Sequence, residues 1–131
     1  MSVASVQIDV SPGELIDKIT ILAIKAKHIK DSTRAENVRR ELDILVAARD
    51  REITHTDALA TLTLELQKVN EDLWSIEDDI RDCEAAEDFD AKFIKLARSV
   101  YKNNDRRAYL KQEINKLLGS RIKEEKSYKP Y

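Results

Sequence analysis

Glycine, proline and cysteine are scarce in this sequence: its 131 residues include two glycines, two prolines and one cysteine. Few residues therefore interrupt a helix, and a composition rich in Ala, Leu, Ile, Glu, Lys, Asp and Arg is typical of long helices. A single cysteine excludes a disulfide within the chain, which fits a reducing compartment. We therefore expect an all-α protein in the cytoplasm.

Signals for membrane insertion or export are also missing. No apolar run approaches the roughly 18 residues that a membrane-spanning helix needs. The N-terminal segment MSVASVQIDV lacks the basic region and the long apolar core of a secretory signal. We expect a soluble protein without a membrane partner.

Charge and motif content exclude further classes. With 23 basic and 25 acidic residues, the net charge of −2 provides no overall field to attract nucleic acid, so none is expected as a partner. The two histidines, His28 and His55, lie in different predicted elements, and the common metal, nucleotide and nucleophile motifs are absent. We expect no metal and no cofactor. The pattern favours a non-enzymatic protein without excluding an enzyme.

The first two helices are predicted from capping signals. Residues 3–10 alternate between apolar and polar side chains, which predicts a short extended arm or edge strand over residues 1–10. Ser11 and Pro12 then suit the start of a helix. The segment KDST at 30–33 indicates a break, after which Ser32 or Thr33 caps a second helix. One long bent helix is the competing interpretation.

The last two helices follow from a heptad pattern, in which apolar residues recur at alternating spacings of three and four. One seam covers residues 59–83 and includes Leu66, and a second covers residues 89–117 and includes Leu110. Gly119 then predicts a helix end, followed by a polar tail at 120–131. The expected fold is a single all-α domain over residues 1–131: an antiparallel bundle of about four long helices with coiled-coil-like packing.

Self-association is expected from the proportions of such a bundle. Helices of about 30 residues span about 45 Å, and a short chain folded into rods this long has little core for its surface. We expect an apolar face, most of all on the first helix, to close against a second copy in a homodimer. The alternative is a compact monomeric four-helix bundle.

The segment NEDLWSIEDDIRDCE (70–84) concentrates acidic residues around the only tryptophan. Its carboxylates surround the helix instead of converging, so a solvated face is favoured over a metal site. Trp74 lies off the seam, with Glu77 beside it, and either packs against the first helix or a second subunit or forms a binding surface.

Polar residues interrupt the seam of the fourth helix at Asn103 and Arg107. They form either a register-setting polar layer or a pocket in which arginines face a small anionic ligand. Asp17 and Lys18 of the first helix would lie at its mouth. The candidate ligand-binding residues are Arg107, Arg98, Tyr101, Asn103 and Asn104, with Glu77 and Trp74 as further contributors.

Three motifs carry a resemblance to a known family: PGELIDKITIL (12–22), LWSIEDDIR (73–81) and NDRRAYLKQEIN (104–115). They resemble a family of small uncharacterised proteins, a domain of unknown function, from bacteria and their viruses. Relatives fused to repeat or glycosyltransferase-like regions would imply an accessory role in glycan assembly. The segment ELIDKITILAIKAK is also loosely similar to the first helix of chorismate mutases, but the rest of that pattern is missing.

Three functions compete on this evidence. The first is a non-enzymatic interaction module, acting as a homodimer or as an adaptor for another protein. The second is a binding protein or enzyme for a small anionic ligand. The third is an all-helical, magnesium-dependent nucleotide pyrophosphatase, which would need paired acidic motifs that are not convincingly present.

Overall fold

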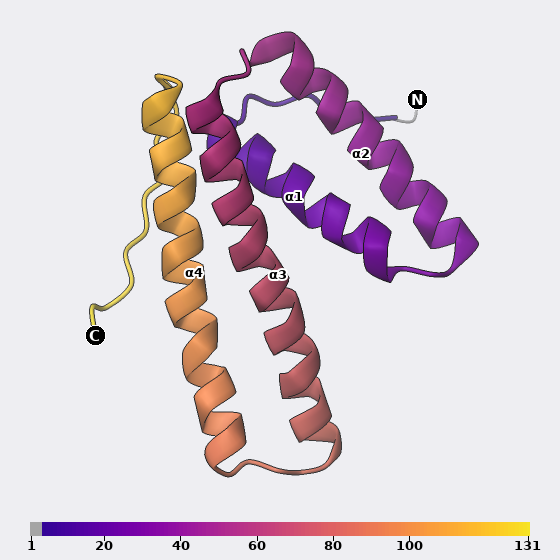
Figure 1. Cartoon of the computed structure of the whole chain (residues 1–131), viewed down its shortest axis with the longest axis vertical. Coiled ribbons are helices and arrows are strands. Elements are labelled where there is room, and N and C mark those ends of the chain that lie inside the picture. The colour runs from indigo at the N-terminus through magenta and orange to yellow at the C-terminus, as the bar shows by residue number, and fades with distance from the viewer. Residues whose placement is uncertain (1–3) are drawn as a thin grey trace.

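The computed structural model describes residues 4–131 and consists of four helices joined by short loops. They are α1 (Pro12–His28), α2 (Ser32–Glu52), α3 (Asp57–Ala85) and α4 (Ala91–Leu117), as Figure 1 shows. No strand occurs in the described part of the chain. The all-α helical bundle predicted from composition and periodicity is confirmed.

Polar side chains cap the helix starts. The Ser11 hydroxyl accepts a hydrogen bond from the Glu14 amide at 3.2 Å, and the Thr56 hydroxyl accepts one from the Leu59 amide at 3.2 Å. The prediction that Ser32 or Thr33 caps α2 is wrong. The cap is Asp31, whose carboxylate accepts the Thr33 amide at 3.3 Å. Because the chain is extended from residue 29 to this cap, α1 and α2 are separate helices.

A left-handed residue ends each of the two long helices. Gly119 has φ of 65° after α4, and Glu87 has φ of 52° after α3. In both places the next amide reaches back to a carbonyl five residues earlier, Ser120 to Asn115 and Asp88 to Cys83. These are Schellman motifs, which satisfy the last carbonyls of a helix. The predicted helix end at Gly119 is confirmed.

Helices α3 and α4 form a long hairpin (Figure 1). Its upper half, the end at which α3 begins and α4 ends, contains the core. Leu66, Leu110 and Ile114 are each 0% exposed there, and Ile16 of α1 joins them. Burying a Leu or Ile side chain fully contributes about 1.5–3 kcal/mol. The two heptad seams therefore meet as the sequence predicts, and their contact holds the hairpin together.

Helix α1 lies against both arms of the hairpin, while α2 packs on α1 alone among the described helices. The apolar side chains of α1, including Leu15, Ile19 and Leu22, are buried inside the chain. The expectation that the apolar face of the first helix closes against a second copy is therefore wrong. That face is already covered by the other three helices.

The lower half of the hairpin extends past α1 and α2 (Figure 1). Here the seam residues Ile76, Ile80, Phe93 and Leu96 are only half-buried. At its tip, Phe89 and Phe93 pack edge to face with ring centroids 5.3 Å apart. This half of the hairpin has two helices where the upper half has three, so its apolar side chains have fewer neighbours.

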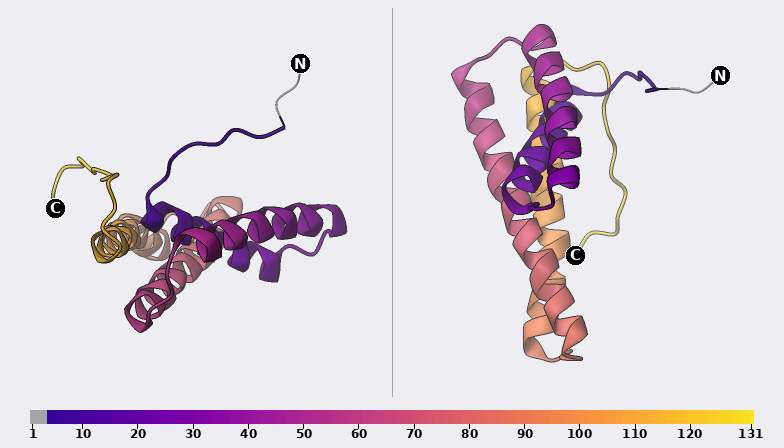
Figure 2. Two further views of the ribbon diagram at one scale, coloured as in Figure 1. Left: turned by 90° about the horizontal axis from the view of Figure 1, so that it is seen from above. Right: turned by 90° about the vertical axis from the view of Figure 1, so that its right-hand side faces the viewer.

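Two extended segments flank the helices. Residues 4–10 carry Val6 and Ile8, which are 76% and 75% exposed, and the segment runs away from the bundle (Figure 2). The first three residues of the predicted arm lie outside the described residues. The C-terminal segment, residues 120–131, runs back along α4 without regular secondary structure. None of the described helices is long and apolar enough to cross a membrane.

Candidate functional site

A buried ion pair joins α1 to the hairpin. Asp17 of α1 is 1% exposed, and its carboxylate accepts two hydrogen bonds from the Arg107 guanidinium of α4. The Nε–Oδ1 bond measures 2.9 Å. Two parallel hydrogen bonds between guanidinium and carboxylate are the strongest geometry for such a pair. Hydrogen bonding to Asp17 raises the pKa of Arg107 above its usual value, because it favours the charged guanidinium.

Helix α3 adds a further hydrogen-bond donor to this ion pair. The Asn70 amide nitrogen donates to Asp17 Oδ1 and to Thr20 Oγ1, both at 2.9 Å. The Thr20 hydroxyl donates to the backbone oxygen of Asp17 at 2.7 Å. A buried carboxylate needs several donors to offset its lost hydration, and here they come from α3 and α4. We call Asp17, Thr20, Asn70 and Arg107 the junction cluster.

A second polar layer lies one helical turn further along α4. Lys111 Nζ contacts Glu14 Oε2 at 2.6 Å and Glu124 Oε2 at 3.1 Å. The Ser11 hydroxyl donates to the other oxygen of Glu124 at 2.6 Å. Burial lowers the pKa of Lys111, but hydrogen bonds to both glutamates outweigh it, so this pKa lies above its usual value. The layer ties the start of α1 to the C-terminal segment.

Gly13 allows α1 and α4 to approach closely. Its amide donates to Asn115 Oδ1 at 2.7 Å. A Cβ atom at this position would lie 2.5 Å from the backbone oxygen of Lys111 and 2.8 Å from Asn115 Oδ1. No side chain larger than hydrogen fits between these helices.

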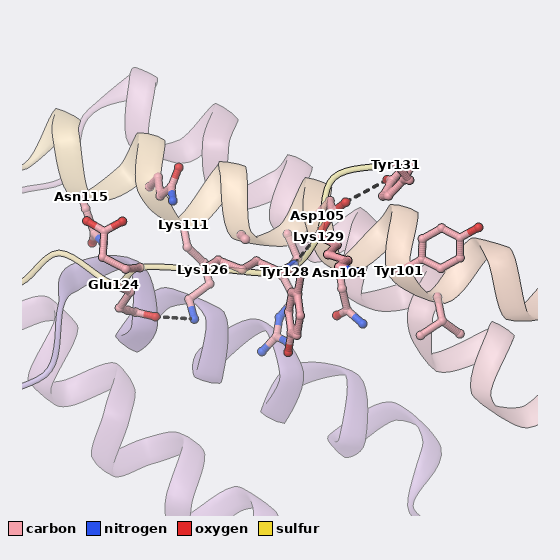
Figure 3. A pocket seen from close by; sticks show the side chains of 15 residues that line it. Tyr101, Asn104, Asp105, Lys111, Asn115, Glu124, Lys126, Tyr128, Lys129 and Tyr131 are labelled. Atoms are coloured by element: carbon pink, nitrogen blue, oxygen red, sulfur yellow. Dashed lines mark hydrogen bonds and ion pairs between the residues drawn. The ribbon is translucent and has the colours of Figure 1, made fainter.

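A groove of about 700 Å³ separates α4 from the C-terminal segment (Figure 3). The segment is anchored at Asp105, whose carboxylate accepts Lys126 Nζ at 2.7 Å and the Tyr131 hydroxyl at 2.8 Å. The Tyr131 ring also packs edge to face on Tyr101, with centroids 5.0 Å apart. Aromatic, cationic and acidic side chains thus share the walls of this groove.

The anchoring of this segment should depend on pH. Burial would raise the pKa of Glu124, but hydrogen bonds from Ser11 and Lys111 bring it below its usual value. Hydrogen bonds from Lys126 and Tyr131 likewise lower the pKa of Asp105. The ordinary pKa values of these carboxyl groups are 4.5 for Glu124 and 3.8 for Asp105. At pH values above these, both groups are ionised and their contacts stabilise the folded state in full. That stabilisation is lost as the pH falls through the lowered pKa values of the folded state.

We therefore expect the C-terminal segment to detach as pH falls below 3.8, the lower of the two ordinary values, and before the helices unfold. An NMR titration would show the amide signals of residues 121–131 moving to random-coil positions while those of α3 stay in place. A Glu124→Gln, Asp105→Asn variant should show the detached signals already at neutral pH. Unchanged tail signals across the titration would contradict the anchoring roles of Glu124 and Asp105.

The structure places the seven sequence-predicted ligand-binding residues in several environments. Tyr101, Asn104 and Arg107 line the groove. Arg98 is exposed on α4, and the Asn103 amide donates to the Ser99 backbone oxygen at 2.8 Å in its own helix. These last two do not line the groove.

The two candidates on α3 lie elsewhere. The Trp74 ring stacks on His28 of α1, with centroids 5.0 Å apart. Glu77 pairs with Arg81 on the exposed side of the same helix at 3.0 Å. Neither residue lines the groove. Trp74 therefore packs against the first helix, which is one of the three possibilities that the sequence left open for it.

The set of candidate residues drawn from the sequence omits several residues that build this region, above all Asn70, Lys111, Asn115 and Glu124. A signal was present for two of them, because Arg107, Lys111 and Asn115 recur at intervals of four and so share one side of a helix. No local pattern marks Asn70 or Glu124, since their partners lie 53 and 113 residues away. Within residues 4–131, no group of three or more His, Cys, Asp or Glu side chains is placed to hold a metal ion.

Comparison with known proteins gives one match. The model of a family of unknown function (DUF6165) matches residues 6–131, which is nearly the whole chain. No curated protein and no solved structure matches. All residues of the junction cluster and of the second polar layer lie within the matched range. The chain belongs to the DUF6165 family.

Proposed function

We propose that this protein is a non-catalytic helical interaction module that works by self-association. The observation that carries the proposal is the contrast between the two halves of the α3–α4 hairpin. In the upper half, Leu66 and Leu110 are 0% exposed. In the lower half Cys83 is buried, but Ile76 and Leu96, which continue the same seams, are only half-buried. A second copy would supply the cover that the lower half lacks.

The state of the polar residues supports a structural role for the junction cluster. Asp17 is held by Arg107 and Asn70, and every buried side-chain nitrogen and oxygen of the described residues has a hydrogen-bond partner. A catalytic acid or base has to reach a substrate, whereas this carboxylate is 1% exposed and both of its oxygens accept hydrogen bonds from protein donors. The cluster fits a fastening of α1 to the hairpin.

The alternative is a small anionic ligand in the groove beside the C-terminal segment. Four cationic side chains line this groove, and three of them already contact carboxylates: Arg107 with Asp17, Lys111 with Glu14 and Glu124, and Lys126 with Asp105. An anion would have to displace these internal partners or bind through Lys129 alone. The pairing therefore favours the interaction module over the ligand-binding protein.

Sedimentation equilibrium tests the proposal directly. One chain has a mass of 15.1 kDa, and we expect the average mass to rise towards twice that value as protein concentration increases over two decades. A mass that stays at that of one chain throughout the range would contradict self-association. Far-UV circular dichroism at the same concentrations would show that helix content does not change.

A further inference from the structure

The charges of the hairpin indicate how two copies meet, an inference that rests on the proposed self-association. Helix α1 covers one face of the hairpin. On this face, residues of α1 contact Asn70 and Trp74 of α3 and Arg107 of α4. In the view from above, α1 and α2 lie together on one side of the hairpin (Figure 2). The face opposite α1, which we call the back face, carries neither helix.

Helix α3 places an acidic row on the back face. Glu65, Asp72 and Asp79 are seven residues apart, so they share one side of the helix. Asp72 is two residues, or about 200°, from both Asn70 and Trp74, which places this row opposite α1. Asp79 is exposed and has no ion-pair partner among the described residues, while Asp72 pairs with Lys68 on the surface of its own helix.

Helix α4 places a basic row beside it. Lys95 and Lys102 are seven residues apart and Arg106 follows four residues later. Lys102 is nine residues, or about two and a half turns, before Lys111, so it lies on the opposite side of the helix from Lys111, whose amine faces α1. Lys95 and Lys102 are exposed and make no ion pair within residues 4–131. The Arg106–Glu65 contact at 3.5 Å shows that the two rows run along the same face.

Two rows of opposite charge on one face make that face complementary to itself. A two-fold axis parallel to the hairpin lays the acidic row of one copy over the basic row of the other, and the two acidic-to-basic contacts in the interface are then identical. An axis perpendicular to the helices would instead oppose acidic to acidic and basic to basic. We propose that the protein dimerises through its back face, with parallel hairpins and with α1 and α2 outside on both copies.

The apolar seam between the rows supplies surface for this contact. Ile76 lies four residues after Asp72 and three before Asp79, so it borders the acidic row on the seam side, and it is half-buried in one chain. Burial of such side chains provides the main driving force of association, while the flanking charges set the orientation and reject the wrong one. The partner is therefore a second copy of this chain, because the same hairpin offers both rows.

Charge reversal followed by mixing tests this arrangement. One variant carries Asp72→Lys and Asp79→Lys, and the other carries Lys95→Glu and Lys102→Glu. Each alone opposes like charges across the interface, so we expect its dimer dissociation constant to rise by at least about tenfold. An equimolar mixture should form a heterodimer about as tight as the natural dimer. The positions are exposed or half-exposed, so helix content should stay unchanged in both variants.

A matched control carries Arg39→Glu and Arg40→Glu, two exposed residues of α2 that make no ion pair in the described chain. It changes the net charge as much as the basic-row variant does and should dimerise like the natural protein. If the natural protein dimerises and both reversed variants do so equally well, the back-face arrangement is wrong while self-association stands. The arrangement would also be wrong if both variants dimerise weakly and their equimolar mixture forms no tight heterodimer. If the natural protein stays monomeric, the proposed function, self-association, is itself contradicted.

Discussion

Replacing Arg107 with alanine is expected to lower the free energy of unfolding by about 3–5 kcal/mol, because it leaves a buried carboxylate without its counter-ion. Asp17 is 1% exposed and would keep only the Asn70 amide and local groups as partners. Since α1 is held to α4 at this point, we expect α1 and α2 to loosen from the hairpin first. Urea unfolding followed by circular dichroism measures the loss.

The adjacent residue provides the control. Arg106 is also an arginine of α4, but its contact with Glu65 is 3.5 Å long and both side chains are about half exposed. Exposed pairs of this kind contribute about 0.2–1 kcal/mol. An Arg106→Ala variant should therefore be nearly as stable as the natural protein. Equal losses for the two variants would show that the buried pair with Asp17 has no special part in stability.

Replacing Gly13 with alanine should also destabilise the protein, by about 1–3 kcal/mol or more. Alanine is ordinarily favoured over glycine inside a helix by about 1 kcal/mol, so the expected sign is opposite to that of helix propensity. The reason is the clash of a Cβ atom with the backbone oxygen of Lys111 at 2.5 Å. Relief requires the two helices to separate, which also stretches the hydrogen bond from Gly13 to Asn115.

Gly119 serves as the comparison for this substitution. It has φ of 65°, but nothing lies within 4 Å of a Cβ atom there. Gly119→Ala should cost about 1 kcal/mol, from backbone strain alone. Thermal unfolding of both variants separates the causes: we expect the larger loss at Gly13. A stabilised Gly13→Ala protein would contradict the close approach of α1 and α4.

The helices and their seams could be predicted because they depend on local signals. Ser11 and Thr56 are capping residues with nearby partners, and the spacing of leucines places Leu66 and Leu110 in one core. The predicted cap of α2, Ser32 or Thr33, is one or two residues too late because Asp31, Ser32 and Thr33 are all suitable caps. A local pattern could not choose among them.

The junction cluster could be predicted only in part. Arg107 was marked by its seam position, because a guanidinium there must find a partner. Its partner Asp17 lies 90 residues away, and the third member, Asn70, comes from another helix. Which residues meet across helices depends on the rotation and tilt of α1 against the hairpin. Periodicity within one helix does not determine these quantities, so Arg98 and Asn103 were included and Lys111 was not.

The double-mutant cycle between Asp17 and Arg107 tests most directly whether one buried pair fastens α1 to the hairpin. The cycle compares the unfolding free energies of Asp17→Ala, Arg107→Ala, the double variant and the natural protein. We predict that the double variant loses little more than either single variant, with a coupling of at least about 2 kcal/mol. Losses that simply add would mean that the two side chains act independently, which contradicts the fastening of α1 by this pair.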